Sequence, residues 1–256
     1  MSINFLGKEI PLYGFLFIIG IVVAGLVALT IIKKRNIDSF DFIYGSVMTV
    51  LGAGLGAKLL FIAVSWKDII KYDIPLENII KGGFVFYGGL IGGLITLLVF
   101  TKIYKLNAVD FVDVLAVVVP LGHAFGRVGC FFAGCCYGIQ YDGPFSYVYK
   151  VTAGSTPLGV PLFPVQLLEA LLLLLLFVGL YITFRLKPQR KFLTTEIYVI
   201  AYSVIRFALE FLRGDKERGG FLMLSTSQWI SILLVVGLIA VEIARYVISK
   251  KKSESK

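Results

Sequence analysis

Apolar residues fall in seven long blocks that are separated by short polar or charged segments. The blocks cover residues 10–32, 41–65, 83–104, 111–136, 164–184, 195–213 and 226–248. Each block has about 20 residues or more, the length that an α-helix needs to cross a hydrocarbon core roughly 30 Å thick. The pattern therefore predicts an all-α, polytopic membrane protein with about seven transmembrane helices. We expect one integral membrane domain over 1–249, with a small cap formed by the loop 137–163 and a basic tail at 250–256.

The distribution of Lys and Arg predicts how the chain crosses the membrane. The loops after the first, third and fifth blocks, together with the C-terminal tail, hold more basic residues than the segments on the other side. Cytoplasmic loops carry such an excess, so we expect the N-terminus outside and the C-terminus in the cytoplasm. The cap loop then lies on the outer side.

The composition excludes several other classes of protein. Of the 256 residues, 58% are hydrophobic and only 16% are charged, and the mean hydropathy is +0.88. A soluble domain carries roughly 25% charged residues, so soluble α/β enzymes, disordered proteins and disulfide-rich secreted domains are excluded. The net charge of +9 is accounted for by the basic loops and the tail, and nucleic acid is not expected as a partner.

Three basic residues lie well inside the apolar blocks, away from the block ends: Lys58, Arg127 and Arg206. A charge near the middle of the bilayer costs about 2.5–3.5 kcal/mol on insertion scales. Each of these side chains should therefore face a polar cavity or a partner, which makes these positions the strongest candidates for function.

Polar residues surround the two arginines in sequence. At 100° per residue, His123, Arg127 and Cys130 share one face of the fourth block. The other groups are Arg206, Glu210 and Arg213, spaced i, i+4 and i+7 in the sixth block, and Gln166 and Glu169, one turn apart in the fifth. These groups are expected to converge near the outer ends of three helices.

The charges of this constellation point to an anionic ligand. Two intramembrane arginines exceed what Glu210 alone neutralises, so we expect spare positive charge. A guanidinium group binds phosphate through a planar pair of donors, and a phospholipid headgroup is the phosphate available at that depth. Two alternatives stay open: Arg206 and Glu210 could form only an intrahelical salt bridge, and His123 could be a hydrogen-bonded helix residue.

Cys130, Cys135 and Cys136 lie within seven residues, so no widely spaced disulfide framework is available. Together with His123 they offer four zinc ligands, but the adjacent cysteines and the absence of a C-x2-C spacing argue against tetrahedral closure. A redox role normally uses C-x-x-C as well. The simplest interpretation is small buried residues at a crowded helix end, and neither a metal nor a cofactor is expected.

Glycines at small-xxx-small spacing indicate close helix packing in the second and third blocks. The pairs are Gly52 with Gly56, Gly88 with Gly92, and Gly89 with Gly93.

Five sequence segments resemble, in the same order, motifs of the bacterial prolipoprotein diacylglyceryl transferase family. The central one is PLGHAFGRVGCF at 120–131, followed by Gly134 and Gly138. The others are PLYG at 11–14, GGFVFYGGLIG at 82–92, PVQLLE at 164–169, and RFALEFLR at 206–213 with the later Ser227-Gln228. The segments extend over residues 11–228, nearly the whole chain.

The resemblance implies a seven-helix enzyme of the bacterial cytoplasmic (inner) membrane with an outer cap. The implied reaction moves the diacylglyceryl group of phosphatidylglycerol to the lipobox cysteine in the signal peptide of a prolipoprotein, and glycerol phosphate leaves. In the implied site, Arg127 and Arg206 hold the phosphate and Glu210 holds Arg206. The residues implied to line the lipid site are Tyr13, Gly138, Gln166 and Arg213.

The chain also departs from the family pattern. Tyr87 stands where many members carry a histidine, so the base is expected to be Tyr87 or His123, which is the only histidine. Cys130, Cys135 and Leu168 replace the usual Asn, Glu and Tyr. Two alternative functions follow: a related transferase with the same lipid donor and another acceptor, or a membrane thiol or metal protein built on Cys130, Cys135 and Cys136.

Overall fold

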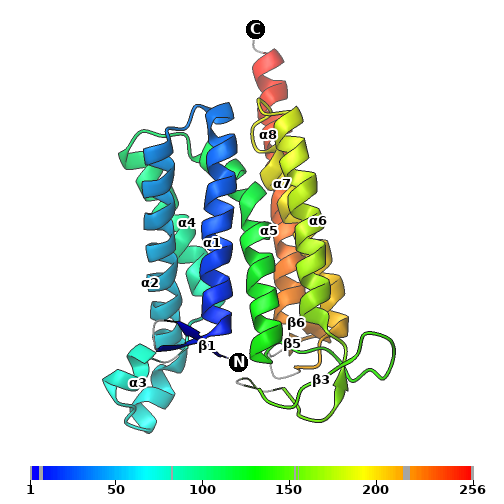
Figure 1. Ribbon diagram of the computed structural model, residues 1–256. Coiled ribbons are helices and arrows are strands. Elements are labelled where there is room, and N and C mark those ends of the chain that lie inside the picture. The colour runs from blue at the N-terminus through cyan, green and yellow to red at the C-terminus, as the bar shows by residue number, and fades with distance from the viewer. Residues whose placement is uncertain are drawn as a thin grey trace. The chain divides into compact units, whose positions relative to one another are not determined.

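The computed structural model describes residues 2–5, 8–81, 83–152, 154, 156–215 and 220–254. These residues are mostly helical (Figure 1). The helices are α1 (Leu12–Ile31), α2 (Ser39–Lys71), α3 (Leu76–Lys81), α4 (Phe86–Ile103), α5 (Ala108–Ala133), α6 (Val165–Leu186), α7 (Leu193–Leu209) and α8 (Thr226–Glu254). Two short 3-10 helices, η1 (Ile32–Arg35) and η2 (Glu210–Leu212), follow α1 and α7.

Each of the seven apolar blocks contains one long helix, and five of the helices are long and apolar enough to cross a membrane. These five candidate spans are Leu12–Arg35, Ser39–Lys71, Ala108–Ala133, Val165–Leu186 and Thr226–Arg245. The part of α4 from Tyr87 to Ile103 is apolar but shorter, and α7 has 17 residues. Many large apolar side chains on these helices are exposed, as expected of surfaces that face lipid. The chain is therefore a multi-pass membrane protein.

The chain forms two units, which are described separately. The smaller unit is 32–112 and the larger unit combines 1–31 with 113–256. In the smaller unit, α2 and α4 pack at backbone distance, because a Cβ at Gly56 would collide with the carbonyl oxygen of Gly88, and one at Gly92 with that of Gly52. This confirms the close packing expected from the glycine spacing. Gly82 lies outside the described residues.

In the smaller unit, the Lys58 side chain binds backbone carbonyl groups. Its Nζ donates to the carbonyl oxygens of Ile79, Ile80 and Gly83 at 3.1–3.2 Å, and it lies 4.2 Å from the centre of the Phe84 ring. The ammonium group thus fastens the end of α3 and the segment before α4 to α2. Of the three intramembrane charges, this one is accounted for by the fold.

In the larger unit, α5 packs between α1 and α6. Gly20 of α1 is so close to α5 that a Cβ there would lie 2.7 Å from the Cβ of Phe125. On the α6 side, Ala124 packs in a buried cluster with Ala170 and Leu173. Small residues on both faces therefore let α5, which carries most of the candidate site, lie close to two neighbours.

A buried aspartate fixes the start of α7. The Asp113 carboxylate accepts from the backbone N–H groups of Phe192 and Thr195 at 2.7 and 3.2 Å and from the Thr194 and Thr195 hydroxyls. A carboxylate that satisfies the free N–H groups of a helix start favours that start thermodynamically. This contact ties α7 to α5 at the end opposite to the candidate site.

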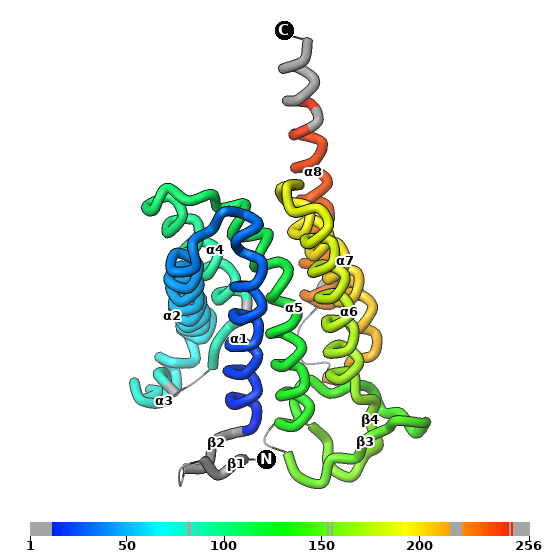
Figure 2. Tube along the Cα trace, turned by 45° about the horizontal axis from the view of Figure 1, so that its top comes forward, coloured from blue at the N-terminus to red at the C-terminus, as the bar shows by residue number. Residues whose placement is uncertain are grey.

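The loop between α5 and α6, called the cap below, lies at the other end of the larger unit. The first turns of α1, α6 and α8 and the last turns of α5 and α7 lie at this end, beside the loop that contains β3 and β4 (Figures 1 and 2). Strand β3 (Tyr147–Val148) pairs with β4 (Pro161–Leu162). The remaining strand pairs are β1 (Ser2–Phe5) with β2 (Lys8–Pro11) and β5 (Gly220–Phe221) with β6 (Leu224–Ser225).

Tyr149 attaches the cap to the end of α5. Its buried hydroxyl donates to the carbonyl oxygen of Phe131 at 3.0 Å. Burial, reinforced by the neighbouring Tyr147, raises the pKa of the Tyr149 phenol to about 12. The phenol is therefore a neutral donor at ordinary pH, and it holds one of the carbonyl groups that the helix end leaves free.

Candidate functional site

Arg127 on α5 is paired with a residue of the neighbouring helix. Its Nη2 lies 3.0 Å from Oε1 of Glu169, which is buried near the start of α6. The Nε2 atom of His123, one turn before Arg127, lies 4.0 Å from the same oxygen. His123 also packs edge-on against the Tyr202 ring of α7 at 5.5 Å between centroids. Three helices thus contribute to one polar cluster.

Arg206 on α7 forms the ion pair that the i, i+4 spacing predicts. Its Nη2 lies 2.7 Å from Oε2 of Glu210 and donates to the Ser227 hydroxyl at 2.9 Å. Ser227 in turn lies 3.1 Å from the Ser225 hydroxyl, and both serines hydrogen-bond with Glu210. The start of α8 therefore orients the Arg206 side chain.

The two arginine pairs belong to one cluster. His123 is close enough to interact electrostatically with both Arg127 and Arg206, and Tyr202 does so with both as well. Tyr202 precedes Arg206 by one helical turn, and its ring packs against His123, so this tyrosine belongs to the same cluster. The candidate residues of α5, α6 and α7 therefore lie near one another.

The expected excess of positive charge is wrong for the described residues. Glu169 neutralises Arg127 and Glu210 neutralises Arg206, so the cluster carries two cations and two anions. The sequence placed Glu169 one turn from Gln166 but gave no sign that it would face Arg127, because the pairing depends on how α5 and α6 pack. A charge on a helix in an apolar setting is stable only with such a partner.

These ion pairs leave hydrogen-bonding capacity unused. Among the residues that the structure describes, Nε of Arg127 and Nη1 of Arg206 are buried without a hydrogen-bond partner, and so are Oε1 of Glu169 and Oε2 of Glu210. The two carboxylate oxygens form ion pairs with the guanidinium groups, but the geometry of these contacts is not that of a hydrogen bond. Because an unpaired buried donor costs about 1–3 kcal/mol, the two guanidinium groups are suited to a further acceptor such as a phosphate oxygen.

Arg213 does not continue the helical face of Arg206 and Glu210. Helix α7 ends at Leu209, and Arg213 follows the η2 turn in an extended conformation. It forms a two-fold hydrogen bond with Asp215, with Nε to Oδ1 at 2.9 Å and Nη2 to Oδ2 at 2.8 Å. Its expected place on the same face is therefore corrected, because the helix unwinds before the third residue of the i, i+4, i+7 pattern.

Gly138 brings the cap to Arg213. The two residues form an antiparallel bridge, in which Ile139 N donates to Leu212 O at 2.9 Å and Gly214 N to Tyr137 O at 3.0 Å. A Cβ at Gly138 would collide with the carbonyl oxygen of Phe163. The position thus requires glycine for close backbone packing.

Gln166 and Tyr13 both lie against the end of α5. The buried Gln166 donates from Nε2 to the carbonyl oxygen of Cys135 at 2.8 Å. Tyr13, in the first turn of α1, packs on Gly129 and is close enough to interact electrostatically with Arg127 and the three cysteines. Tyr87 lies at the start of α4 in the smaller unit, half-buried, and its role stays a prediction.

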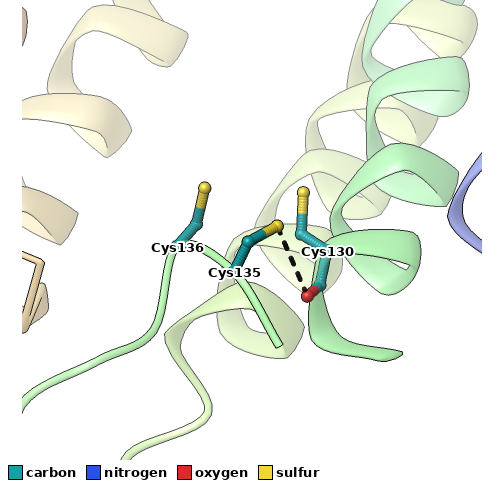
Figure 3. A group of neighbouring side chains, drawn as sticks. All are labelled: Cys130, Cys135 and Cys136. Carbon is teal, nitrogen blue, oxygen red and sulfur yellow. Dashed lines mark hydrogen bonds between the residues drawn. The ribbon is translucent and has the colours of Figure 1, made fainter. Parts of the chain in front are cut away.

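The three cysteine side chains gather at the last turn of α5 and the residues after it (Figure 3). No disulfide joins any of the three to another described residue, and their Sγ atoms lie within 4.8 Å of one another. Arg213 hydrogen-bonds with Cys136, and Arg127 interacts electrostatically with Cys130 and Cys136. The cysteine cluster therefore adjoins the arginine cluster.

Sequence reasoning missed several members of the site. Tyr202, Ser225 and Asp215 each contact a candidate residue. Tyr202 stands four residues before Arg206 and could have been found from that spacing. Asp215 lies in a loop and Ser225 in the short strand β6, and the hydrophobic pattern predicts the path of the chain at neither.

Comparison with known proteins assigns nearly the whole chain to one family. The family model for prolipoprotein diacylglyceryl transferase matches residues 1–244. A relative from Clostridium perfringens, named phosphatidylglycerol--prolipoprotein diacylglyceryl transferase 2, is 34% identical over 232 residues, which cover 90% of this chain and 89% of the relative. Relatives with the same enzyme name include one from Clostridium tetani, 34% identical over 94% of this chain and 95% of its own length. Another is from Acinetobacter baumannii, 28% identical over 90% and 86%.

Proposed function

Because the chain belongs to the prolipoprotein diacylglyceryl transferase family, we propose that it transfers the diacylglyceryl group of phosphatidylglycerol to the lipobox cysteine of prolipoproteins. The acceptor thiol loses a proton and its sulfur forms a thioether with the glyceryl carbon. The bond between that carbon and the phosphate oxygen breaks, and glycerol phosphate leaves with the electron pair. This is the first step of lipoprotein maturation.

The observation that carries the site assignment is the pair of buried arginines with unused donors. Arg127 and Arg206 come from different helices, and each keeps one buried nitrogen without a hydrogen-bond partner in the described part of the chain. The phosphodiester of the donor lipid carries one negative charge, and the departing phosphate monoester gains a second as the carbon–oxygen bond breaks. Donors placed in advance around that phosphate stabilise the transition state more than the ground state, which is what raises the rate.

Glu169 and Glu210 act in this proposal as positioning residues. A guanidinium group that is already neutralised can stay in an apolar helix bundle when no lipid is bound. When the phosphate arrives, the free N–H groups bind it while the carboxylates keep the guanidinium planes fixed. Arg213, Tyr13, Gln166 and Gly138 then border the headgroup site from the cap side.

Removal of the thiol proton is assigned to His123 or Tyr87. A phenol with a reference pKa near 10 is a poor base at neutral pH, whereas an imidazole is suited to the task. H123Q and Y87F can be compared across pH. The variant that lacks the base should lose transfer at neutral pH and recover it above about pH 8.5, where the peptide thiol ionises unaided.

We further propose seven membrane crossings, with the N-terminus outside and the C-terminus inside the bacterial cytoplasmic membrane. Within the larger unit, α1 and α8 both begin at the end that carries the cap, and α8 runs to the opposite end (Figure 1). An odd number of crossings agrees with this arrangement. Accessibility of tags at both termini on the same side of the membrane would contradict it.

The transferase activity is tested with purified protein, phosphatidylglycerol vesicles and a synthetic lipobox peptide. The peptide should gain the mass of one diacylglyceryl unit, and one glycerol phosphate should appear for each modified peptide. A peptide with serine in place of the lipobox cysteine is the control and should stay unmodified. Glycerol phosphate without peptide modification would identify a different acceptor, and neither product would overturn the proposal.

A further inference from the structure

The backbone turn at the end of α5 places Cys135 next to Cys130. Gly134 has φ +68°, and the N–H groups of Gly134 and Cys135 bond to the carbonyl oxygens of Phe131 and Cys130 at 3.2 and 3.1 Å. This is the Schellman pattern that ends a helix through a left-handed residue. It folds Cys135 back over the last turn, and its Sγ lies 3.7 Å from the Cys130 carbonyl oxygen.

The next residue brings the third thiol to the same place. Cys136 has φ +56°, a left-handed conformation that is uncommon for a residue with a side chain. Adjacent side chains in an extended segment point to opposite sides, and the left-handed turn removes this separation. The adjacency of Cys135 and Cys136 argued against a metal site at the sequence level. In the structure, Cys135 points toward Cys130, Cys136 points to the same side as Cys130, and the three sulfurs lie close together (Figure 3).

Hydrogen bonds from outside the segment hold the turn in this shape. The hydroxyl groups of Thr152 and Thr156 donate to the Gly134 carbonyl oxygen, and Gln166 donates to that of Cys135 at 2.8 Å. Thr156 and Gln166 are buried. The cap and α6 therefore fix the backbone that carries the thiols, and strained residues held in this way are typical of functional sites.

The thiol geometry fits a soft, tetrahedral metal ion. With zinc–sulfur bonds of about 2.3 Å, two sulfurs of a tetrahedral site lie about 3.8 Å apart. The three Sγ atoms lie within 4.8 Å of one another. Side-chain rotations that move each sulfur by less than about 1 Å would bring them to the spacing of a zinc site. Cys135 and Cys136 are partly exposed, which leaves a path for an ion and for a fourth ligand.

The charges around the cluster also fit. Three thiolates and one Zn²⁺ carry a net charge of −1. Arg213 hydrogen-bonds with Cys136, and Arg127 lies close enough to act on Cys130 and Cys136. Hydrogen bonds from such groups to metal-bound thiolates stabilise a site and tune it.

We propose that Cys130, Cys135 and Cys136 bind one Zn²⁺ ion and leave its fourth position for the thiol of the acceptor peptide. The inference rests on the proposed transferase function. Three protein ligands with an open position are typical of catalytic zinc sites, and metal coordination is one way to activate a nucleophile. The acceptor thiol gives up its proton on binding the metal, and the base proposed above, His123 or Tyr87, takes it. Its sulfur then attacks the glyceryl carbon, the phosphate oxygen takes the electron pair, and the uncharged thioether dissociates as a weaker ligand.

Metal binding is measured on the whole wild-type protein in detergent after chelation and dialysis under reducing conditions. Titration with Co²⁺ should give one ion per chain and a thiolate-to-cobalt charge-transfer band, and Zn²⁺ should displace it. Addition of the lipobox peptide should raise the band by about one third, as three metal–sulfur bonds become four. The serine peptide should leave it unchanged. X-ray absorption of the zinc form should give Zn–S distances of about 2.3 Å.

C130S, C135S and C136S should each lower the charge-transfer band and weaken zinc binding by more than about 100-fold. Removal of a group that only hydrogen-bonds to a metal ligand can already weaken binding by up to about 100-fold, so removal of a ligand should weaken it further. M223S is the matched control, because it removes sulfur from an exposed side chain in the turn between β5 and β6. It should bind Co²⁺ like the wild type. Gel filtration and thermal melting of each variant separate loss of metal from loss of fold.

The results distinguish the two proposals. Wild-type protein that modifies the peptide but binds no Co²⁺ overturns the metal site and leaves the transferase function intact. Protein that binds one Co²⁺ through three thiolates but never modifies the peptide supports the site and overturns the function. A charge-transfer band that does not respond to the lipobox thiol overturns the open fourth position. A disulfide among the three cysteines in protein purified without oxidant overturns the metal site as well.

Discussion

The carboxylate of Glu169 and the guanidinium of Arg127 lie 3.0 Å apart and join α6 to α5 inside the helix bundle. The Glu169 side chain is 1% exposed, so this pair is shielded from water on the glutamate side. Neutralisation across helices explains how Arg127 remains in an apolar block. It also means that the proposed phosphate site relies on oriented donors rather than on unpaired charge.

E169Q should therefore impair both folding and transfer. The substitution leaves Arg127 buried with an uncompensated charge, and breaking such a pair costs about 3–5 kcal/mol. We expect a lower melting temperature in detergent and a large loss of transfer in the mass-shift assay. E242Q, on the exposed part of α8, is the control and should behave like the wild type. Equal stability of E169Q and wild type would show that the pair does not stabilise the bundle.

R206Q should abolish transfer while the protein stays folded in the membrane. The variant removes both the ion pair with Glu210 and the unused Nη1 donor. Loss of one preorganised donor lowers rates by about 100- to 1,000-fold, and R206K should also be slow because lysine lacks the planar fork. R245Q is the matched control, since Arg245 forms exposed ion pairs with Glu196 and Glu242. R206Q turnover within a few-fold of wild type would exclude Arg206 from the phosphate site.

The positions of the helices could be predicted because hydrophobic length alone determines them. Each of the seven apolar blocks contains a helix, and the Arg206–Glu210 pair follows from the i, i+4 spacing on one helix. Pairings between helices could not be predicted in this way. Arg127 and Glu169 are 42 positions apart, and their contact depends on the small residues that bring α5 and α6 together.

The end of a helix was a further limit. The pattern places Arg213 one turn beyond Glu210, but α7 stops at Leu209 and the chain turns toward the cap. The spacing of hydrophobic residues does not change at this point, so the sequence alone does not show where α7 ends. The left-handed Cys136 is a similar case, because a cysteine gives no sign of a positive φ.

Alkaline pH should loosen the cap through Tyr149. Its pKa is about 12 when folded and near 10 when unfolded, so the unfolded form ionises first. The stabilisation is therefore complete below pH 10 and is lost as the pH rises through 12. Melting temperatures measured from pH 9 to 12 should fall more steeply for the wild type than for Y149F. At pH 8, Y149F should be about 1 kcal/mol less stable, because it lacks the hydrogen bond to Phe131. Parallel curves for the two proteins would contradict this role of the phenol.

G56A should disrupt the packing of α2 against α4, whereas G54A should not. A Cβ at Gly56 collides with the carbonyl oxygen of Gly88, and backbone atoms cannot move aside without separating the helices. At Gly54, two residues earlier on the same helix, a Cβ meets nothing within 4 Å. Alanine is the better helix former by about 0.5–1 kcal/mol, so G54A should match or exceed the wild type in stability.

The measurement is the yield of folded protein and its melting temperature after purification of both variants from membranes. Because the two substitutions add the same methyl group to the same helix, a difference between them reports on the helix contact and not on helix propensity. G56A should give the lower value in both readouts. If G56A and G54A melt together, then α2 and α4 can separate without cost, and the small-xxx-small pairs do not hold these helices in contact.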